Sequence, residues 1–133
     1  MKKKLASNAV DFAALFQLIM AGGNDAVLLF DKRGHVLYAN PLASKRLGYN
    51  TEALTRLQIF DLEEDLNMVG YLQRWESAST KKDKYWLVEW RLSSGETQFF
   101  RVQCTLFKST SPPLLCCVIP PAGSIQNLKA PTY

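Results

Sequence analysis

The chain has 133 residues, of which 47% are hydrophobic and 21% are charged, and this is the composition of one ordinary folded domain. Its formal net charge of +4 includes the run Lys2, Lys3 and Lys4, and elsewhere the basic residues are mixed with acids. Nucleic-acid-binding domains usually carry a basic stripe interleaved with aromatic residues, so we expect no nucleic acid as a partner. No apolar run approaches the ~20 residues of a membrane-spanning helix, which predicts no membrane insertion.

The chain has three cysteines, Cys104, Cys116 and Cys117. Their number is odd, two of them are adjacent, and none has the paired spacing of a zinc site. This pattern is typical of reduced thiols in an intracellular protein. We therefore expect a cytoplasmic location, and we expect no metal site.

Residues 1–23 predict an amphipathic helix from about residue 9 to 21. Its apolar side chains recur at i, i+3, i+4 and i+7, so they share one stripe. They are Phe12, Leu15, Phe16 and Ile19. Two interpretations of the stripe are open, because it can pack on the domain's own sheet or contact a second copy of the chain.

The next segment predicts a β-hairpin followed by a helix. The short apolar runs AVLLFD and HVLYAN are separated by KRG, with Gly34 suited to a positive φ. Asn40 stands before Pro41, where an Asn side chain can accept from free helical amides and proline suits the first helical position. We expect Asn40 to be the structural cap of a short helix that ends at Gly48, and a second short helix in NTEAL.

The middle of the chain predicts an irregular stretch and then a longer helix. The stretch TRLQIFDLEED has Leu57, Ile59 and Phe60 as its apolar anchors. A helix over residues 64–78 would align Met68, Leu72 and Trp75 on one face. It would also place the acids at 63–65 near its positive end.

The last third predicts three strands. Apolar and polar side chains alternate along YWLVEWRL and again along QFFRVQCTLF, and paired prolines bracket LLCCVI. A helix, two strands, short helices and three further strands favour an α+β domain, with one antiparallel sheet and helices on one face. We divide the chain into the helix at 1–23, a domain over 24–121 and a linker or tail over 122–133.

The stretch NDAVLLFDKRGHVLYANPLASKRLGYNTEAL resembles the opening of a PAS (sensory box) domain, and WRLSSGETQFFRVQCTLF is similar to that family's final hairpin. The residues that fit the opening are Asp31, Gly34, Asn40, Ala43, Leu47, Gly48 and Tyr49. The resemblance spans about residues 8–120 and implies a five-stranded antiparallel sheet of order 2-1-5-4-3 with short helices over one face. It also implies a sensor module of a longer bacterial signalling protein, such as a histidine kinase or a cyclic-dinucleotide enzyme.

The resemblance further implies a homodimer whose contact includes the N-terminal helix. One departure concerns the last strand, which in signalling members leads into an Asp-Ile-Thr-like junction with the next domain. Here the strand runs into VIPPAGS. Signal transfer through the family's usual junction is therefore not expected from this sequence.

The cofactors of PAS relatives require particular residues. A haem version needs an axial histidine near the 64–78 helix, but the chain's only histidine is His35, at the hairpin. Met68 is then the one other candidate for an axial ligand, and a weak one. The light-sensing flavin version resembles Asn-Cys-Arg-Phe-Leu-Gln, and the helical region here has no cysteine. Haem and a cysteinyl flavin adduct are not expected, while a non-covalent flavin or another small molecule stays open.

Two functions are compatible with this sequence. The leading one is a non-catalytic sensory or relay module that binds a small ligand between the 64–78 helix and the inward faces of the last strands. The expected ligand contacts are Met68, Leu72, Trp75, Trp86, Val88, Trp90, Phe100, Val102 and Cys104. The alternative is a ligand-free dimerisation domain in which the tryptophans only fill the core. Catalysis would have to depend on His35, the chain's only histidine, and this residue is predicted in or beside an exposed turn. We therefore expect that the chain is not an enzyme.

Overall fold

The computed structural model describes residues 24–80, 85–108 and 111–121. The expected N-terminal helix, with Phe12, Leu15, Phe16 and Ile19, lies outside the described residues, as does the whole expected tail over 122–133. Those expectations therefore stay predictions.

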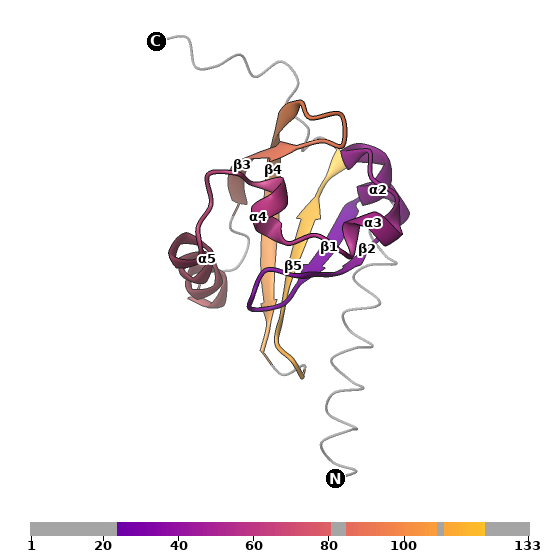
Figure 1. Cartoon of the computed structure of the whole chain (residues 1–133). Helices are drawn as coiled ribbons and strands as arrows, with labels where there is room; N and C mark the ends of the chain where they lie inside the picture. Colours follow the sequence, from indigo (N-terminus) through magenta and orange to yellow (C-terminus); the bar gives the residue numbers. More distant parts are fainter. Residues whose placement is uncertain (1–23, 81–84, 109–110, 122–133) are drawn as a thin grey trace, which may run out of the picture.

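One antiparallel sheet organises the domain (Figure 1). Its strands are β1 (Ala26–Phe30), β2 (Val36–Ala39), β3 (Tyr85–Arg91), β4 (Thr97–Phe107) and β5 (Leu114–Ile119). They lie in the order β2-β1-β5-β4-β3, and every neighbouring pair is antiparallel. This confirms both the α+β class and the strand order that the resemblance implied.

In the described part of the chain, four helices follow β2 and pack on one face of the sheet. They are α2 (Pro41–Leu47), α3 (Thr51–Leu54), α4 (Ile59–Leu62) and α5 (Met68–Thr80). α2 contacts β1, α3 contacts β2, and α5 contacts β4 near the opposite side of the sheet (Figure 1).

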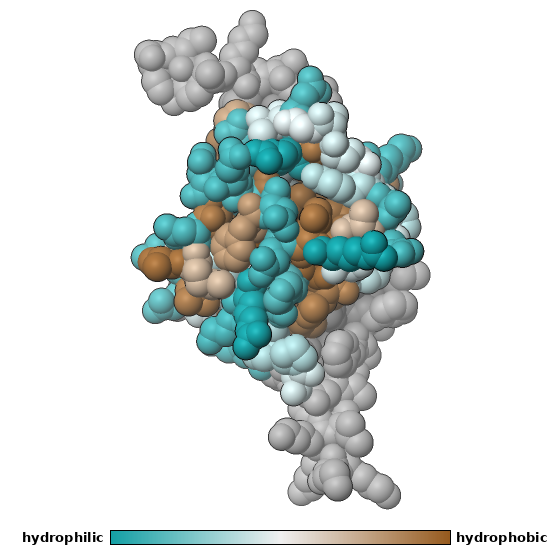
Figure 2. Space-filling view, viewed as in Figure 1, coloured by the Kyte–Doolittle hydropathy of each residue, from teal (hydrophilic) through white to brown (hydrophobic). Residues whose placement is uncertain are grey.

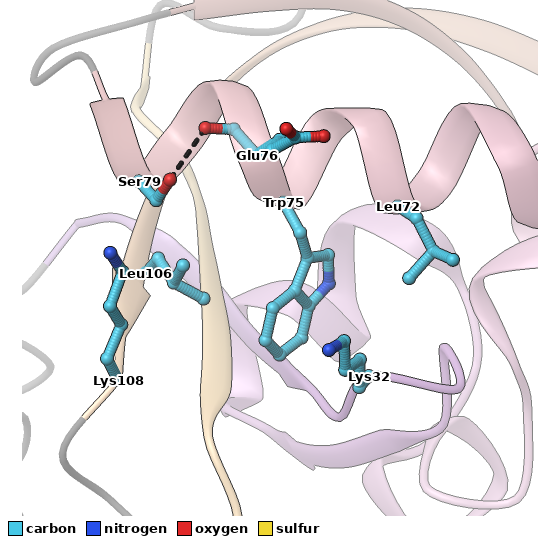
Figure 3. Close-up of a pocket in the computed structure, with 7 residues that line it drawn as sticks. All are labelled: Lys32, Leu72, Trp75, Glu76, Ser79, Leu106 and Lys108. Atoms are coloured by element: carbon cyan, nitrogen blue, oxygen red, sulfur yellow. Dashed lines mark hydrogen bonds between the residues drawn. The ribbon is translucent and has the colours of Figure 1, made fainter.

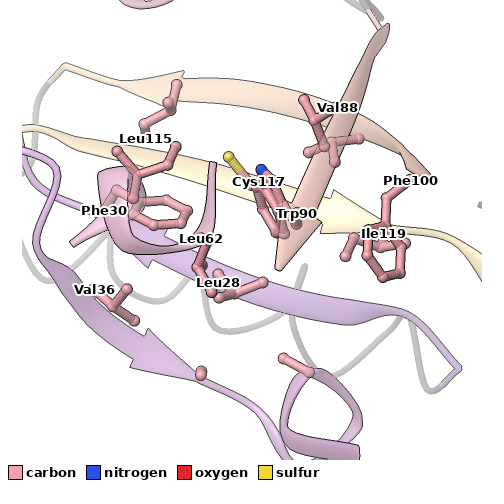
Figure 4. Packing of buried hydrophobic residues seen from close by; sticks show 14 of the residues in the cluster. Leu28, Phe30, Val36, Leu62, Val88, Trp90, Phe100, Leu115, Cys117 and Ile119 are labelled. Atoms are coloured by element: carbon pink, nitrogen blue, oxygen red, sulfur yellow. The ribbon is translucent and has the colours of Figure 1, made fainter. Parts of the chain in front are cut away.

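The main core lies between these helices and the inward faces of the strands. Figure 4 shows Trp90 amid apolar side chains from several strands. Its indole is fully buried and meets the ring of Phe30 edge-on, with the ring centroids 6.4 Å apart. The alternation predicted for the last strands is confirmed, because Val88, Trp90 and Phe100 all point into this core.

Two expectations about the middle of the chain were wrong. The stretch expected to be irregular contains α4, because Gln58 and Asp61 form a reciprocal capping box, with the Asp61 carboxylate accepting from the Gln58 amide at 2.8 Å. The following helix begins at Met68 rather than near residue 64, since the Asn67 side chain accepts from the Gly70 amide at 2.8 Å. The acids at 63–65 therefore precede α5 and do not form its first turn.

The hairpin between β1 and β2 is built around Asp31. One Asp31 carboxylate oxygen accepts from the amide of His35 at 2.9 Å, and the other lies 3.1 Å from the His35 ring. Gly34 closes the turn with a φ of 91°, in the region that favours glycine. His35 is a half-exposed strand-edge residue that forms an isolated bridge with Gln58.

Asn40 joins this hairpin to the helical layer. Its amide donates to the Val27 carbonyl at 3.0 Å, as in a strand ladder, but its own carbonyl accepts from Ser44 in the first turn of α2. The side-chain oxygen of Asn40 takes the carbonyl's place in the ladder, accepting from Val27 at 3.0 Å, and it also accepts from Ala43 at 2.9 Å. Asn40 is thus both a helix cap and the last rung between β1 and β2.

A buried ion pair positions α5. Arg74 of α5 donates two hydrogen bonds, of 2.9 and 2.8 Å, to the carboxylate of Glu63, and the Trp90 indole donates to the same carboxylate at 2.9 Å. The side chains of Arg74 and Glu63 are only 10% and 14% exposed. Burial, the largest single influence, lowers the pKa of Arg74, but the hydrogen bonds and the charge of Glu63 together outweigh burial and raise that pKa, so Arg74 keeps its charge.

We expect Asn40→Ala to lower the free energy of unfolding by about 2–4 kcal/mol, because it removes a cap worth about 1 kcal/mol and leaves a buried strand amide without an acceptor. Asn50→Ala is the matched control, since the Asn50 side chain accepts from Ala53 in an exposed cap, and should cost about 1 kcal/mol. Urea unfolding followed by circular dichroism measures both values. Equal losses would contradict the ladder role of Asn40.

We expect Glu63→Gln to lower the free energy of unfolding by about 3 kcal/mol, because Arg74 then stays buried without its counter-charge. Glu64→Gln removes the neighbouring pair with Arg91, in which Glu64 is 71% exposed, and should cost less than about 1 kcal/mol. The same urea experiment compares the two variants. A small loss in Glu63→Gln would show that the pair does not hold α5 in place.

Candidate functional site

A groove of about 350 Å³ opens at the surface between α5, the end of β4 and the turn after β1 (Figure 3). Its walls combine apolar and charged side chains. They are Lys32, Leu72, Trp75, Glu76, Ser79, Leu106 and Lys108. Small-molecule sites are concave and combine apolar walls with polar groups that orient the ligand. This groove has apolar walls in Leu72, Trp75 and Leu106 and four polar or charged side chains, and we take it as the candidate binding site.

Trp75 is the most buried side chain in the groove. It is 6% exposed, and its ring meets that of Tyr71 edge-on with centroids 6.2 Å apart. Among the residues that the structure describes, its buried indole N–H has no hydrogen-bond partner, and the neighbouring Tyr71 hydroxyl donates to the Asp31 carbonyl at 2.6 Å. Burial raises the pKa of the Tyr71 phenol, so this donor keeps its proton. Trp75 is left as a donor that can serve a ligand.

The predicted ligand contacts fall into three groups. Leu72 and Trp75 line the groove, and Met68 stands at the start of α5, 42% exposed. Trp86 is half-buried, with the Arg74 guanidinium 5.9 Å from its ring centre. The others pack in the core: Val88, Trp90, Phe100, Val102 and Cys104. The structure thus places most of the expected contacts away from the groove.

Sequence reasoning missed the charged part of the groove. Lys32 follows β1 and Lys108 follows β4, so they are far apart in the chain and meet only through the fold. Glu76 and Ser79 lie on α5, one and four residues after Trp75. The helical period of α5 could have indicated Ser79, but no local pattern indicated the lysines.

The cysteines are part of the packing. Cys104 and Cys117 face each other across β4 and β5, with their sulfur atoms 3.3 Å apart and both residues buried. Burial raises the pKa of the Cys116 thiol to about 12 and that of Cys117 well above its usual value. The thiols of Cys116 and Cys117 are therefore protonated and poor nucleophiles at neutral pH. Within the described residues, no group of His, Cys, Asp and Glu side chains could hold a metal ion.

A second apolar cluster lies on the other face of the sheet. Its buried residues are Val27, Leu29, Leu114 and Cys116, bordered by Phe107 and Val118. All are on strands, and none of the described helices contributes to the cluster. Both faces of β1 and β5 are therefore buried.

Arg46 of α2 ties the two ends of the domain together. One guanidinium nitrogen donates to the carbonyls of Ile119 and Pro120, at 2.8 and 2.9 Å, and the other to the carbonyl of Asn24 at 3.2 Å. Asn24 precedes β1, and Pro120 follows β5. The planar fork of an arginine suits such several-fold binding better than a lysine would.

Comparison with known families fits this geometry. A sequence model described as PAS domain matches residues 14–83, more than half of the chain. The chain belongs to the PAS domain family. PAS domains are generally sensory modules without catalysis of their own.

Solved structures share the fold of this PAS domain. It is similar to the PAS domain of a Desulfitobacterium hafniense protein, with 23% identity, a TM-score of 0.59 and coverage of 72% of this chain and 91% of that one. A PAS domain from a two-component sensor histidine kinase has 18% identity and a TM-score of 0.61, with coverage of 83% of this chain and 96% of that one. A domain of a sensory box sensor histidine kinase/response regulator from Geobacter sulfurreducens has 12% identity and a TM-score of 0.64, with coverage of 81% of this chain and 92% of that one.

No curated protein sequence matches this PAS domain. Among its described helices, none is both long enough and apolar enough to span a bilayer.

We expect Arg46→Ala to speed hydrogen exchange at the amides of Ala26 and Ile119, which pair across β1 and β5 beside the Arg46 contacts. Loss of these bonds should lower the local opening free energy by about 1–2 kcal/mol, which is roughly a 5–30-fold faster exchange. Lys45→Ala, an exposed neighbour on α2, is the control and should change neither amide. Unchanged exchange in Arg46→Ala would contradict the proposal that Arg46 holds the two ends of the domain together.

Proposed function

We propose that this PAS domain is a ligand-responsive sensory module of a longer bacterial signalling protein, such as a histidine kinase or a cyclic-dinucleotide enzyme. The observation that carries the proposal is the groove beside α5, which is lined by Trp75, whose buried N–H has no partner within the described part of the chain. The module performs no catalysis itself, acts in the cytoplasm and passes its signal to an output domain of the same protein.

A route from the groove to the end of the domain supports a relay. Leu106 of β4 lines the groove and pairs with Leu115 of β5. β5 ends at Ile119, whose carbonyl accepts a hydrogen bond from Arg46. A ligand that favours one packing of α5 against β4 would shift the position or order of β5. The signal would then leave through the segment that Arg46 holds, because a ligand acts only by favouring one of two states.

We also propose that the module works as a homodimer. The apolar outer face of β1 and β5 supports this, since Val27, Leu29 and Cys116 are buried there without help from the described helices. The sequence predicts a partner for such a face in the N-terminal stripe of Phe12, Leu15, Phe16 and Ile19. That stripe would pack on the outer face and also meet the second chain.

A ligand-free dimerisation domain is the second candidate. It is favoured by the solid packing of the inward strand faces, where Trp90 and Phe100 are fully buried. Native mass spectrometry and absorbance spectra of the purified chain distinguish the two functions. An added mass or a co-purified chromophore supports the sensor, whereas a ligand-free dimer that binds nothing in a small-molecule screen supports the scaffold.

We expect removal of residues 1–22 to halve the solution mass measured by light scattering, because it removes the predicted stripe. Phe12→Ser with Phe16→Ser should do the same in the full chain. Val10→Ser is the control, since the helical spacing places Val10 off the stripe. A dimer that survives the truncation would overturn the proposed contact.

A further inference from the structure

We infer that the groove beside α5 selects a small ligand with an apolar, planar body and one carboxylate-like anionic group. The inference rests on the proposed function, because it names the class of ligand that the sensor detects. It is drawn from the shape of the groove, its charges and the unpaired donor of Trp75.

The size and walls of the groove set the body of the ligand. A volume of about 350 Å³ is near the lower end of small-molecule sites, which favours a compact ligand over a large cofactor. Leu72 and Leu106 supply apolar walls around the Trp75 indole. Figure 3 shows Lys108 and Leu106 on one side of that indole and Lys32 and Leu72 on the other. An aromatic ring is well suited to such a slot.

The charges of the groove indicate an anion. Two lysines, Lys32 and Lys108, line it against a single acid, Glu76. The ammonium groups of both lysines are without an ion-pair partner among the residues that the structure describes. They come from separate segments and line the same groove, so together they give it a positive potential that favours an anionic ligand.

The Trp75 N–H gives the ligand a hydrogen-bond acceptor to satisfy. Buried N–H groups are nearly always paired, and an unpaired one carries a free-energy cost that a suitable acceptor removes. Figure 3 shows the nitrogen edge of the indole turned toward Leu72 and Lys32. The indole nitrogen has almost no solvent-exposed surface, so a carboxylate oxygen held by Lys32 would accept from Trp75 only after a small movement of the side chains that cover it. The same group would answer both the charge and the unpaired donor.

Phenylacetate and phenylacetamide test this inference, because they have nearly the same shape and differ in charge. The ¹⁵N-labelled full chain has three indole N–H resonances, one for each tryptophan, and Trp75→Phe assigns that of Trp75. We expect phenylacetate to shift the Trp75 resonance and to bind at least about fivefold more tightly than the amide, roughly the effect of one charge-assisted hydrogen bond.

Lysine variants locate the anionic group. Lys32→Gln should weaken phenylacetate binding several-fold, Lys108→Gln should weaken it less because Lys108 lies on the other side of the indole, and both should leave phenylacetamide binding unchanged. Lys45→Gln, on the exposed face of α2, should bind phenylacetate as the unaltered chain does. All three lysines are exposed, so the variants should remain folded, and their circular dichroism spectra check this.

The outcomes separate this inference from the proposed function. Equal binding of the acid and the amide, with the Trp75 resonance shifted by both, would overturn the anionic class and leave the groove as the sensor's site. No shift of Trp75 with either probe would overturn the inference. A ligand found by native mass spectrometry would then still uphold the sensor, and a ligand-free chain that also binds nothing in the small-molecule screen would end both proposals.

Discussion

The fold depends on one constraint at the edge of the sheet, where a single backbone carbonyl is required twice. At Asn40 the strand ladder and the first turn of α2 both need the carbonyl oxygen, and the helix takes it. The Asn40 side chain completes the ladder in its place and caps the helix as well. The chain can therefore leave β2 directly into α2, and the helices that follow gather on one face of the sheet.

The second determinant is the pairing of Glu63 with Arg74, which holds α5 at a distance from α2 along the sheet. A buried ion pair adds little over an apolar replacement, but it requires one geometry and is costly when incomplete. The Trp90 indole, bound to the same carboxylate, ties that geometry to β3. The groove exists because α5 is fixed in this position, with the turn after β1 and the end of β4 forming its other walls.

The extent to which this arrangement was predictable depended on the range of each signal. The alternation in YWLVEWRL and the Asn40–Pro41 pair are local, so they predicted β3 and the start of α2. The capping box of Gln58 and Asp61 is also local, but its residue types are less usual at that position, and the acids after it suggested a helix start that Asn67 in fact provides. In the site, Leu72 and Trp75 were predicted from helical spacing, whereas Lys32 and Lys108 carried no local signal.

The sequence by itself determined the family, the antiparallel sheet and the inward faces of its strands, because these follow from short-range alternation and from turn residues in a fixed order. Only the tertiary structure decided that Arg46 holds both ends of the domain, that Glu63 serves α5 and β3, and that two distant lysines share one groove. Each of these joins residues far apart in the chain. Such contacts depend on the packing of the whole sheet, which no single segment encodes.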